Sequence, residues 1–232
     1  RTLLDVAVRS ADLVSKDFEY DKLKVWPGHQ VIEMGLVKLF RATGDRRYLD
    51  LARFFLDIRG PDGRQYNQAV RKPVDQTEAE GHAVRATYMY SGMADIAAIT
   101  KDDAYLRAIT HIWEDIVYKK MYVTGGIGAT GGNEGFAEPY FLPNMSAYCE
   151  TCASIGNIFT NHRLFLLHGE CKYADILEKT LYNSMLSGVS LTGDRFFYPN
   201  PLESSGQHQR SEWFGCACCP SNIARFIPAI PG

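Results

Sequence analysis

The chain has 232 residues, of which 46% are hydrophobic and 22% are charged, and its formal net charge is −2. A chain of this length can bury a sizeable core as one large domain or two small ones. The balanced charge and the lack of a lysine-rich tract exclude a basic surface that binds nucleic acid. No stretch approaches the roughly 18 consecutive apolar residues of a membrane span, so we expect neither nucleic acid nor membrane as a partner.

The spacing of the apolar residues is mostly that of amphipathic helices. In chain order, helices are expected near residues 2–16, 29–42, 46–58, 77–99, 103–119, 151–168 and 172–188. Two segments interrupt this pattern. Residues 123–144 are rich in glycine and predict a loop, and residues 189–203 predict a β-hairpin or a short extended excursion. The glycine-rich loop has no Gly-Lys-Ser/Thr and follows no predicted strand, so a phosphate site is not expected there.

An eight-residue pattern recurs at the junctions between helices. T-G-D-R-R-Y-L-D begins at Thr43, T-K-D-D-A-Y-L-R begins at Thr100, and a weaker copy, H-G-E-C-K-Y-A-D, begins at His168. Each copy ends one helix, offers an acidic cap and starts the next helix with a tyrosine that can pack inward. Repeats of this size indicate helical hairpins packed side by side, as a solenoid or a closed toroid. The long and dissimilar loops favour the closed α/α toroid.

Five of the six cysteines fall in two tight clusters. These are C-E-T-C, from Cys149 to Cys152, and C-A-C-C, from Cys216 to Cys219. Cysteines so close in sequence pair poorly with each other as disulfides and suit metal binding better. Zinc takes four ligands from cysteine, histidine and carboxylate. With Glu150, the two clusters offer six candidates for four places.

A zinc that only joins two segments is the simplest interpretation of these clusters. Two features favour a reactive site instead. The C-A-C-C half departs from the paired C-x-x-C of zinc ribbons, and Pro220, just after it, can begin a helix whose amides favour a nearby thiolate. The glycine-rich loop also carries a carboxylate, Glu134, in a flexible setting that is entropically unfavourable for a residue needing only solvation.

Other polar residues occur where helices are expected to begin or pack. His29 and His82 stand at two predicted helix starts, and such ends can line the central funnel of an α/α toroid. Each could equally be a capping or core residue. Glu178 and Tyr198 have only a structural interpretation from their own surroundings in the sequence.

Together these motifs resemble glycoside hydrolase family 127, whose known activity is β-L-arabinofuranosidase. The matching stretches are GHQVIEMGLVKLF, DQTEAEGHAVRATYMYSGMAD, YVTGGIGATGGNEGF, AYCETCASIGN, FFYPNPLESSG and WFGCACCPSNIAR. They extend from about residue 26 to residue 227. The C-x-C-C-P-x-N-x-A-R signature is specific, and C-E-T-C stands at the matching place before it.

The resemblance implies an all-α (α/α)6 barrel and a retaining, covalent mechanism on a carbohydrate substrate. It implies Cys218 as the nucleophile and Glu134 as the general acid/base. Zinc would be held by Glu150, Cys152, Cys218 and Cys219. The residues implied to contact the sugar are His29, His82, Glu178 and Tyr198. Zinc is therefore the expected cofactor.

Two departures from the family pattern concern the extent of the chain. A full barrel has twelve helices, and the sequence predicts only seven or eight. The chain also begins without Met and without the plan of a signal peptide, so residues 1–232 are expected to be one catalytic domain truncated at both ends, with a cytoplasmic location favoured and a homodimer left open. The Arg59–Gln68 connection is shorter than expected, which suggests a missing stretch.

Two other functions fit the same sequence. One is a sugar isomerase or epimerase on the same barrel, although such enzymes usually rely on histidine pairs and need no zinc thiolate. The other is a zinc-stabilised helical scaffold that binds glycans without turning them over.

Overall fold

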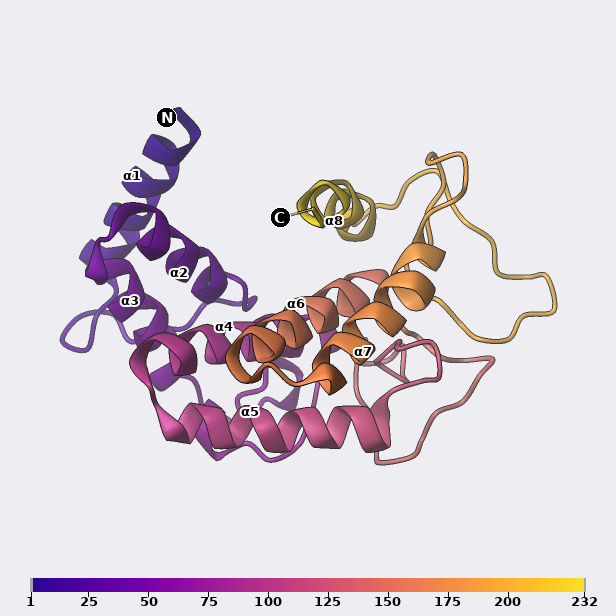
Figure 1. Cartoon of the computed structure of the whole chain (residues 1–232), viewed down its shortest axis with the longest axis horizontal. Helices are drawn as coiled ribbons and strands as arrows, with labels where there is room; N and C mark the ends of the chain where they lie inside the picture. Colours follow the sequence, from indigo (N-terminus) through magenta and orange to yellow (C-terminus); the bar gives the residue numbers. More distant parts are fainter. Residues whose placement is uncertain (1, 232) are drawn as a thin grey trace.

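The computed structural model describes residues 2–231, which fold into paired helices joined by loops of unequal length (Figure 1). The α-helices are α1 (Thr2–Asp17), α2 (Ile32–Thr43), α3 (Arg46–Asp57), α4 (Ala83–Thr100), α5 (Asp103–Asp115), α6 (Thr151–His168), α7 (Cys171–Thr180) and α8 (Cys218–Phe226). Short π-helical segments, η3 (Ile116–Lys120) and η4 (Leu181–Met185), continue α5 and α7. The 3-10 turns are η1 (Gln65–Asn67), η2 (Pro73–Asp75), η5 (Leu186–Gly188) and η6 (Ile227–Ala229). Within residues 2–231, no helix has the length and apolar character to cross a membrane.

The recurring junction pattern acts as the sequence predicts. Asp45 and Asp102 cap α3 and α5 by accepting hydrogen bonds from backbone N–H groups, each at 3.0 Å. The tyrosines that follow, Tyr48 and Tyr105, are buried. In the third copy Glu170 makes no side-chain capping bond, but Tyr173 is buried in the same way. The pattern therefore marks three equivalent hairpin junctions.

Two predicted helices begin later than expected, and a third ends earlier. The helix expected from residue 77 begins at Ala83, because Gly81 takes a left-handed conformation (φ 67°) and His82 is an extended N-cap. The helix expected from residue 29 begins at Ile32. The helix expected to run to residue 188 is α-helical only to Thr180 and then widens into η4.

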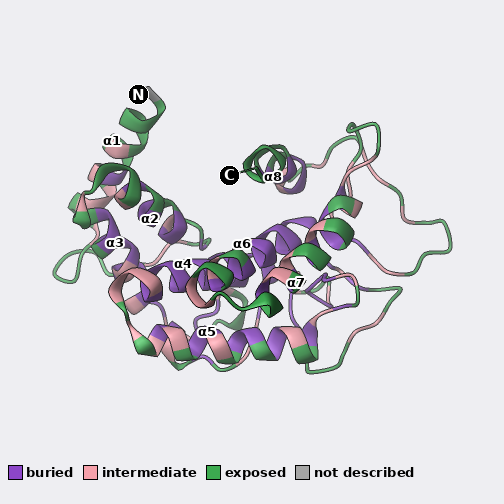
Figure 2. Ribbon diagram, in the orientation of Figure 1, coloured by how far each residue is buried: buried purple, intermediate pink, exposed green. Residues whose placement is uncertain are grey.

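The core lies between α4 and α6, which pack side by side with α5 and α7 outside them (Figure 1). Figure 2 shows buried residues concentrated on α4 and α6 and exposed residues on the outer faces of α1, α5 and α7. The two central helices approach closely where Gly156 of α6 faces Thr87 of α4. A Cβ at Gly156 would lie only 2.1 Å from Oγ1 of Thr87, so this position requires glycine. Trp113 joins α5 to α6 through a hydrogen bond from its Nε1 to Oδ1 of Asn161 at 2.8 Å.

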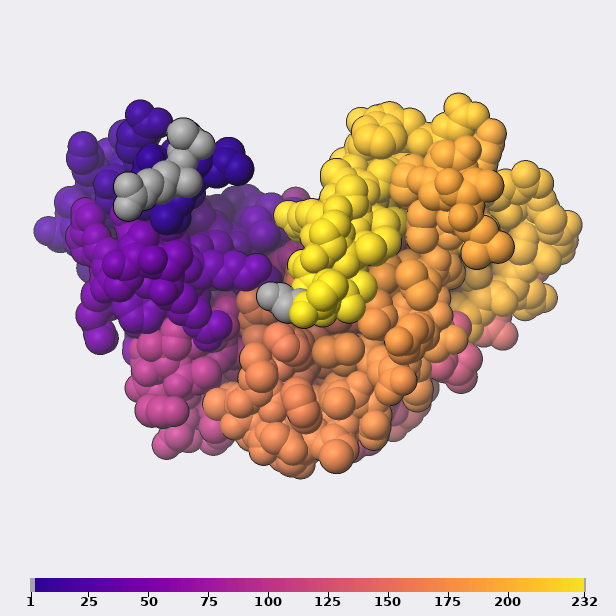
Figure 3. Space-filling view, turned by 45° about the horizontal axis from the view of Figure 1, so that its top comes forward, coloured from indigo at the N-terminus to yellow at the C-terminus, as the bar shows by residue number. Residues whose placement is uncertain are grey.

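Both segments that interrupt the helical pattern are loops held by isolated bridges. Residues 123–144 contain the Thr130–Gly135 bridge, and Gly135 also bridges His82. In residues 189–203, Val189 pairs with Phe196 in the short extended excursion that the sequence predicts. Figure 3 shows the surface hollowed between the N-terminal helices and α8.

Candidate zinc and catalytic site

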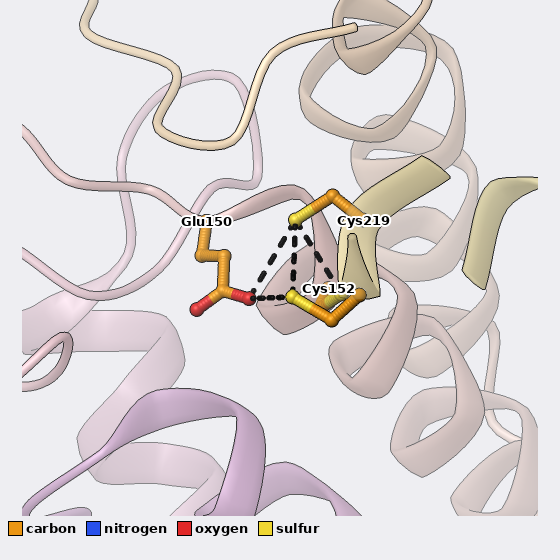
Figure 4. Close-up of side chains that lie close together, drawn as sticks. Glu150, Cys152 and Cys219 are labelled. Atoms are coloured by element: carbon orange, nitrogen blue, oxygen red, sulfur yellow. Dashed lines mark hydrogen bonds between the residues drawn. The ribbon is translucent and has the colours of Figure 1, made fainter. Parts of the chain in front are cut away.

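Two helix starts bring the cysteine clusters together. Cys152 lies in the first turn of α6, just after its N-cap residue Glu150, and Cys218 and Cys219 are the first two residues of α8. The N-terminal end of a helix carries the positive end of its dipole and favours thiolates. Figure 4 shows the side chains of Glu150, Cys152 and Cys219 converging on one point. Pro220, expected to begin the last helix, instead lies in its first turn, where proline is tolerated.

The donor atoms of Glu150, Cys152, Cys218 and Cys219 all lie within 4.8 Å of one another. The Sγ atoms of Cys152 and Cys219 are 3.5 Å apart, and those of Cys218 and Cys219 are 3.9 Å apart. Oε1 of Glu150 is 3.6 Å from Sγ of both Cys218 and Cys219. A tetrahedral zinc ion has edges of about 3.8 Å between sulfurs and about 3.6 Å between sulfur and oxygen. These four residues therefore form a group that can hold a metal ion.

The electrostatics of the four-donor group also fit a cation. Burial, together with the charge of Cys218, raises the pKa of Glu150 to about 9. Hydrogen bonds from Cys152 and Cys219 lower the pKa of Cys218, while the hydrogen bond with Cys218 raises the pKa of Cys152. Oε2 of Glu150 is buried without a hydrogen-bond partner among the described residues. A bound dication would offset the charge that these donors cannot otherwise carry together.

The structure excludes two of the six sequence candidates from this group. Cys149 has a left-handed backbone (φ 40°) and is buried in a small cluster with Tyr122 and Ala147. Burial raises the pKa of the Cys149 thiol to about 12. Cys216 is exposed and does not belong to the four-donor group. The backbone conformation at each cysteine therefore decides which residues join the four-donor group. The spacing of the cysteines in the sequence does not specify that conformation.

Glu134 lies beside this group, on the glycine-rich loop. One carboxylate oxygen of Glu134, one of Glu150 and a ring nitrogen of His82 lie within 4.8 Å of one another. Backbone hydrogen bonds join the loop to the start of α4: Ala83 N–H donates to the Glu134 carbonyl at 3.1 Å, and Phe136 N–H donates to the Gly81 carbonyl at 2.9 Å.

The close backbone approach requires glycine after Glu134. A Cβ at Gly135 would lie 1.8 Å from the carbonyl oxygen of Gly81. Glu134 itself has a left-handed backbone (φ 51°), and its side chain stays 37% exposed. The glycines therefore allow the loop to press against α4 while the carboxylate faces the open side.

Both ring nitrogens of His82 are engaged. Nδ1 accepts the N–H of Arg85 at 3.3 Å, as the cap of α4, and Nε2 lies 2.9 Å from Oε2 of Glu134. Burial lowers the pKa of His82, which keeps the ring neutral near pH 7. Sequence reasoning placed His82 at a helix start, and this position is what brings it to Glu134.

His29 lies near both Cys218 and His82. Its Nδ1 is 2.8 Å from the carbonyl oxygen of Gln30, so this nitrogen is the donor and Nε2 is left for another partner. His29 lines a cavity of about 380 Å³ together with Cys218, Tyr88, Asn222 and Arg225. The ring centroids of His29 and His82 are 6.1 Å apart.

Tyr198 reaches the site from the extended excursion. Its carbonyl accepts the N–H of Thr151 at 3.0 Å, at the start of α6. Burial, the charge of Glu150 and a hydrogen bond to Cys218 raise the pKa of Tyr198, so it stays a neutral phenol. Glu178, in contrast, is exposed on α7, and the structure does not bring it into the four-donor group.

Sequence reasoning missed four residues around the site. Oη of Tyr88 accepts hydrogen bonds from Asn222 and Arg225, both at 2.9 Å, which fastens α8 to α4. Asn222 and Arg225 belong to the C-x-C-C-P-x-N-x-A-R signature, and that was the available signal. Tyr148 lies beside Glu134, and burial is the main cause that raises its pKa.

The family model of the β-L-arabinofuranosidase GH127 catalytic domain matches residues 1–232. The chain belongs to glycoside hydrolase family 127. This confirms the family that the motifs predict and, with it, the all-α fold of (α/α)6 type.

Three GH127 relatives extend this comparison. The non-reducing end β-L-arabinofuranosidase of Bifidobacterium longum subsp. longum is 36% identical over 263 residues, which cover 98% of this chain and 40% of the relative. A solved GH127 β-arabinofuranosidase is 60% identical with a TM-score of 0.95, over 99% of this chain and 37% of that one. The GH127 β-L-arabinofuranosidase of Geobacillus stearothermophilus T6 is 38% identical with a TM-score of 0.93, over 98% and 41%. The chain thus spans about two fifths of the length of these GH127 proteins.

Proposed function

We propose that this GH127 chain catalyses the retaining hydrolysis of β-L-arabinofuranosides, as a single catalytic domain over residues 1–232. The observation that carries the proposal is the place of Cys218. This thiol has a lowered pKa, lines a cavity of about 380 Å³, and belongs to a four-donor group that shares Glu150 with the Glu134–His82 pair. The names of the relatives, all of them β-arabinofuranosidases, support the substrate class.

The chemistry uses Cys218 and Glu134 in two displacements. First, the Cys218 thiolate attacks the anomeric carbon, and Glu134 gives its proton to the departing glycosidic oxygen. A sulfur–carbon bond forms as the carbon–oxygen bond breaks. Next, Glu134 takes a proton from water as the water oxygen attacks the same carbon, and the sulfur–carbon bond breaks to restore the thiolate. Two inversions at one carbon retain its configuration.

Zinc is the cofactor that we propose for the four-donor group. When bound, the ion would hold Glu150, Cys152, Cys218 and Cys219 in place and keep Cys218 deprotonated. Four anionic donors around one dication leave net negative charge, which suits an oxocarbenium-like transition state. The tetrahedral edge lengths, given above, support zinc over an octahedral cation.

The four sugar contacts that the family resemblance implies remain part of this proposal. His29 lines the cavity with one ring nitrogen available, and Tyr198 is held against Cys218. Glu178 is exposed on α7, and its contact with the sugar rests on the family resemblance alone. His82, the fourth residue, lies with Nε2 2.9 Å from Oε2 of Glu134.

A matched pair of cysteine variants tests the proposal in the full chain. Cys218→Ser should lower release of 4-nitrophenol from its β-L-arabinofuranoside by at least about 10³-fold, because a serine hydroxyl is not ionised. Cys171→Ser, which changes an exposed thiol on α7 outside the four-donor group, should leave turnover and bound zinc unchanged. Wild-type turnover of no furanoside or pyranoside, or full activity of Cys218→Ser, would refute the proposal and favour the glycan-binding scaffold.

A further inference from the structure

The two histidines of the site come from segments that are far apart in the sequence. His29 precedes α2, His82 caps α4, and their ring centroids are 6.1 Å apart. His29 is exposed, so burial of its own side chain does not hold it in place. The spacing of the two rings therefore depends on the residues packed beneath them.

The η1 turn is hydrogen-bonded to both histidine segments. The Tyr66 carbonyl accepts the backbone N–H of His82 at 3.2 Å. The Asn67 carbonyl accepts Nε2 of Gln30, which follows the first histidine, at 2.8 Å. The turn ends at Gln68, which is fully buried and has a left-handed backbone (φ 55°). This conformation directs the Gln68 side chain between the two segments.

The side-chain amide of Gln68 also bonds to both segments. Its Oε1 accepts Nε2 of Gln30 at 2.7 Å. Its Nε2 donates to the carbonyls of Glu80 at 2.9 Å and His82 at 3.2 Å. Carbonyl oxygens can only accept, so the orientation of this amide is determined by its surroundings. The orientation of Gln30 is determined in the same way by the Asn67 carbonyl.

The amide of Gln68 fits tightly against the backbone that leads into His82. Gly81 has a left-handed backbone (φ 67°), and a Cβ there would lie 2.0 Å from the carbonyl oxygen of Gln65. The same Cβ would lie 2.9 Å from Nε2 of Gln68. A buried amide that moved would leave its partners without hydrogen bonds, which is unfavourable. The amide and the backbone of the histidine segment are therefore held together.

We infer that Gln68 is a positioning residue that sets the spacing of His29 and His82 without touching the sugar, an inference that rests on the proposed function. Gln68 is fully buried, so it acts only through its hydrogen bonds. One path leads through the Gln30 amide to the segment of His29, and the other leads directly to the carbonyl of His82. Without this amide the two rings can separate, and a sugar that needs both of them binds less tightly.

A matched pair of buried glutamines separates positioning from general stability. Gln68→Met keeps the length of the side chain but removes its bonds to both histidine segments. Gln76 is equally enclosed, and its Nε2 donates to the backbone carbonyl of Gln68 at 2.9 Å but to neither segment. Gln76→Met should therefore lower Tm while the Gln68 amide keeps its own bonds. Gln30→Met is a second test, because it removes the bond between the two amides and leaves the bond from Gln68 to His82.

The assay follows hydrolysis of 4-nitrophenyl β-L-arabinofuranoside by the zinc-loaded chain, well below the lowest Tm of the set. For Gln68→Met we expect KM and the inhibition constant of free L-arabinose to rise about tenfold, with kcat changed less than about threefold. Gln30→Met should show most of this rise, and the double variant should add little, since the two residues share one hydrogen bond. Gln76→Met should leave both constants unchanged, and bound zinc should be the same in every variant.

Three outcomes would overturn the inference while wild-type activity is intact. One is an unchanged KM in Gln68→Met, or in Gln30→Met if Gln68→Met does not fold. Another is an equal rise in Gln76→Met, which indicates a general loosening of this connection. The third is a change in kcat alone. If the wild-type chain neither hydrolyses the glycoside nor binds L-arabinose, the proposed function itself has failed.

Discussion

The contact between α4 and α6 predicts that Gly156→Ala damages both stability and the site. The new Cβ would lie 2.1 Å from Oγ1 and 2.9 Å from Cβ of Thr87, whereas ordinary contacts begin near 3.4 Å. The helices must therefore separate by about 1 Å at this crossing. Thr87 cannot rotate away cheaply, because its Oγ1 donates to the Ala83 carbonyl at 3.0 Å.

The magnitude follows from two opposing effects. Alanine gains about 1 kcal/mol over glycine in a helix interior, and overpacking a tight core costs about 1–3 kcal/mol, occasionally more. We expect Gly156→Ala to be destabilising by up to about 2 kcal/mol net. Gly35→Ala is the matched control, since Gly35 is the fourth residue of α2 and has nothing within 4 Å of its Cβ position. It should be stabilising by about 0.5–1 kcal/mol.

Urea unfolding, followed by helical circular dichroism, measures both free energies of unfolding. Gly156 lies one helical turn after Cys152, so the same displacement should also lower kcat for glycoside hydrolysis by at least about tenfold. Gly35→Ala should leave kcat unchanged. If Gly156→Ala is as stable and as active as Gly35→Ala, the close approach of α4 and α6 does not set the geometry of the site.

Three further predictions concern titration and reactivity. Glu134→Gln should lower kcat/KM for the methyl glycoside by about 10²–10⁴-fold and leave bound zinc unchanged by elemental analysis, whereas loss of zinc would give Glu134 a structural role. In metal-free protein the pKa of Glu150 is raised from 4.5 to about 9 while the pKa of its neighbour Cys218 is lowered, so folding moves one proton from the cysteine to the glutamate; because the pair holds one proton in both states, it should leave Tm nearly unchanged as pH rises from 4.5 to 9, and a Tm that falls across this range in the wild type but not in Glu150→Gln would contradict the coupling. Burial raises the pKa of Cys149 to about 12, so iodoacetamide at pH 8 should modify exposed Cys171 and Cys216 and spare Cys149, as peptide mass spectrometry can check.

Features that depend on local chemistry could be predicted from the sequence. The recurring acidic caps and tyrosines predict the junctions at Asp45 and Asp102, and the structure confirms them. The two cysteine clusters predict a metal site, and the structure brings one donor set together. Both follow because capping and metal binding require particular residue types at short spacing.

Features that depend on backbone direction or on contacts between distant segments could not be predicted from the sequence. Cys149 and Cys152 look alike in C-E-T-C, yet the left-handed backbone of Cys149 directs its side chain away from the group. The pairing of His82 with Glu134 joins residues 52 positions apart through a loop held by Gly135. No periodicity signals such a contact, because it exists only once the loop has packed against α4.

The most direct test of the account identifies the side chain that carries the sugar during turnover. The zinc-loaded protein is treated with an arabinofuranose-configured cyclophellitol, digested and mapped by mass spectrometry. We expect one adduct per chain, on the sulfur of Cys218, with none in Cys218→Ser. An adduct on the carboxylate of Glu134 or Glu150 in active protein would contradict it.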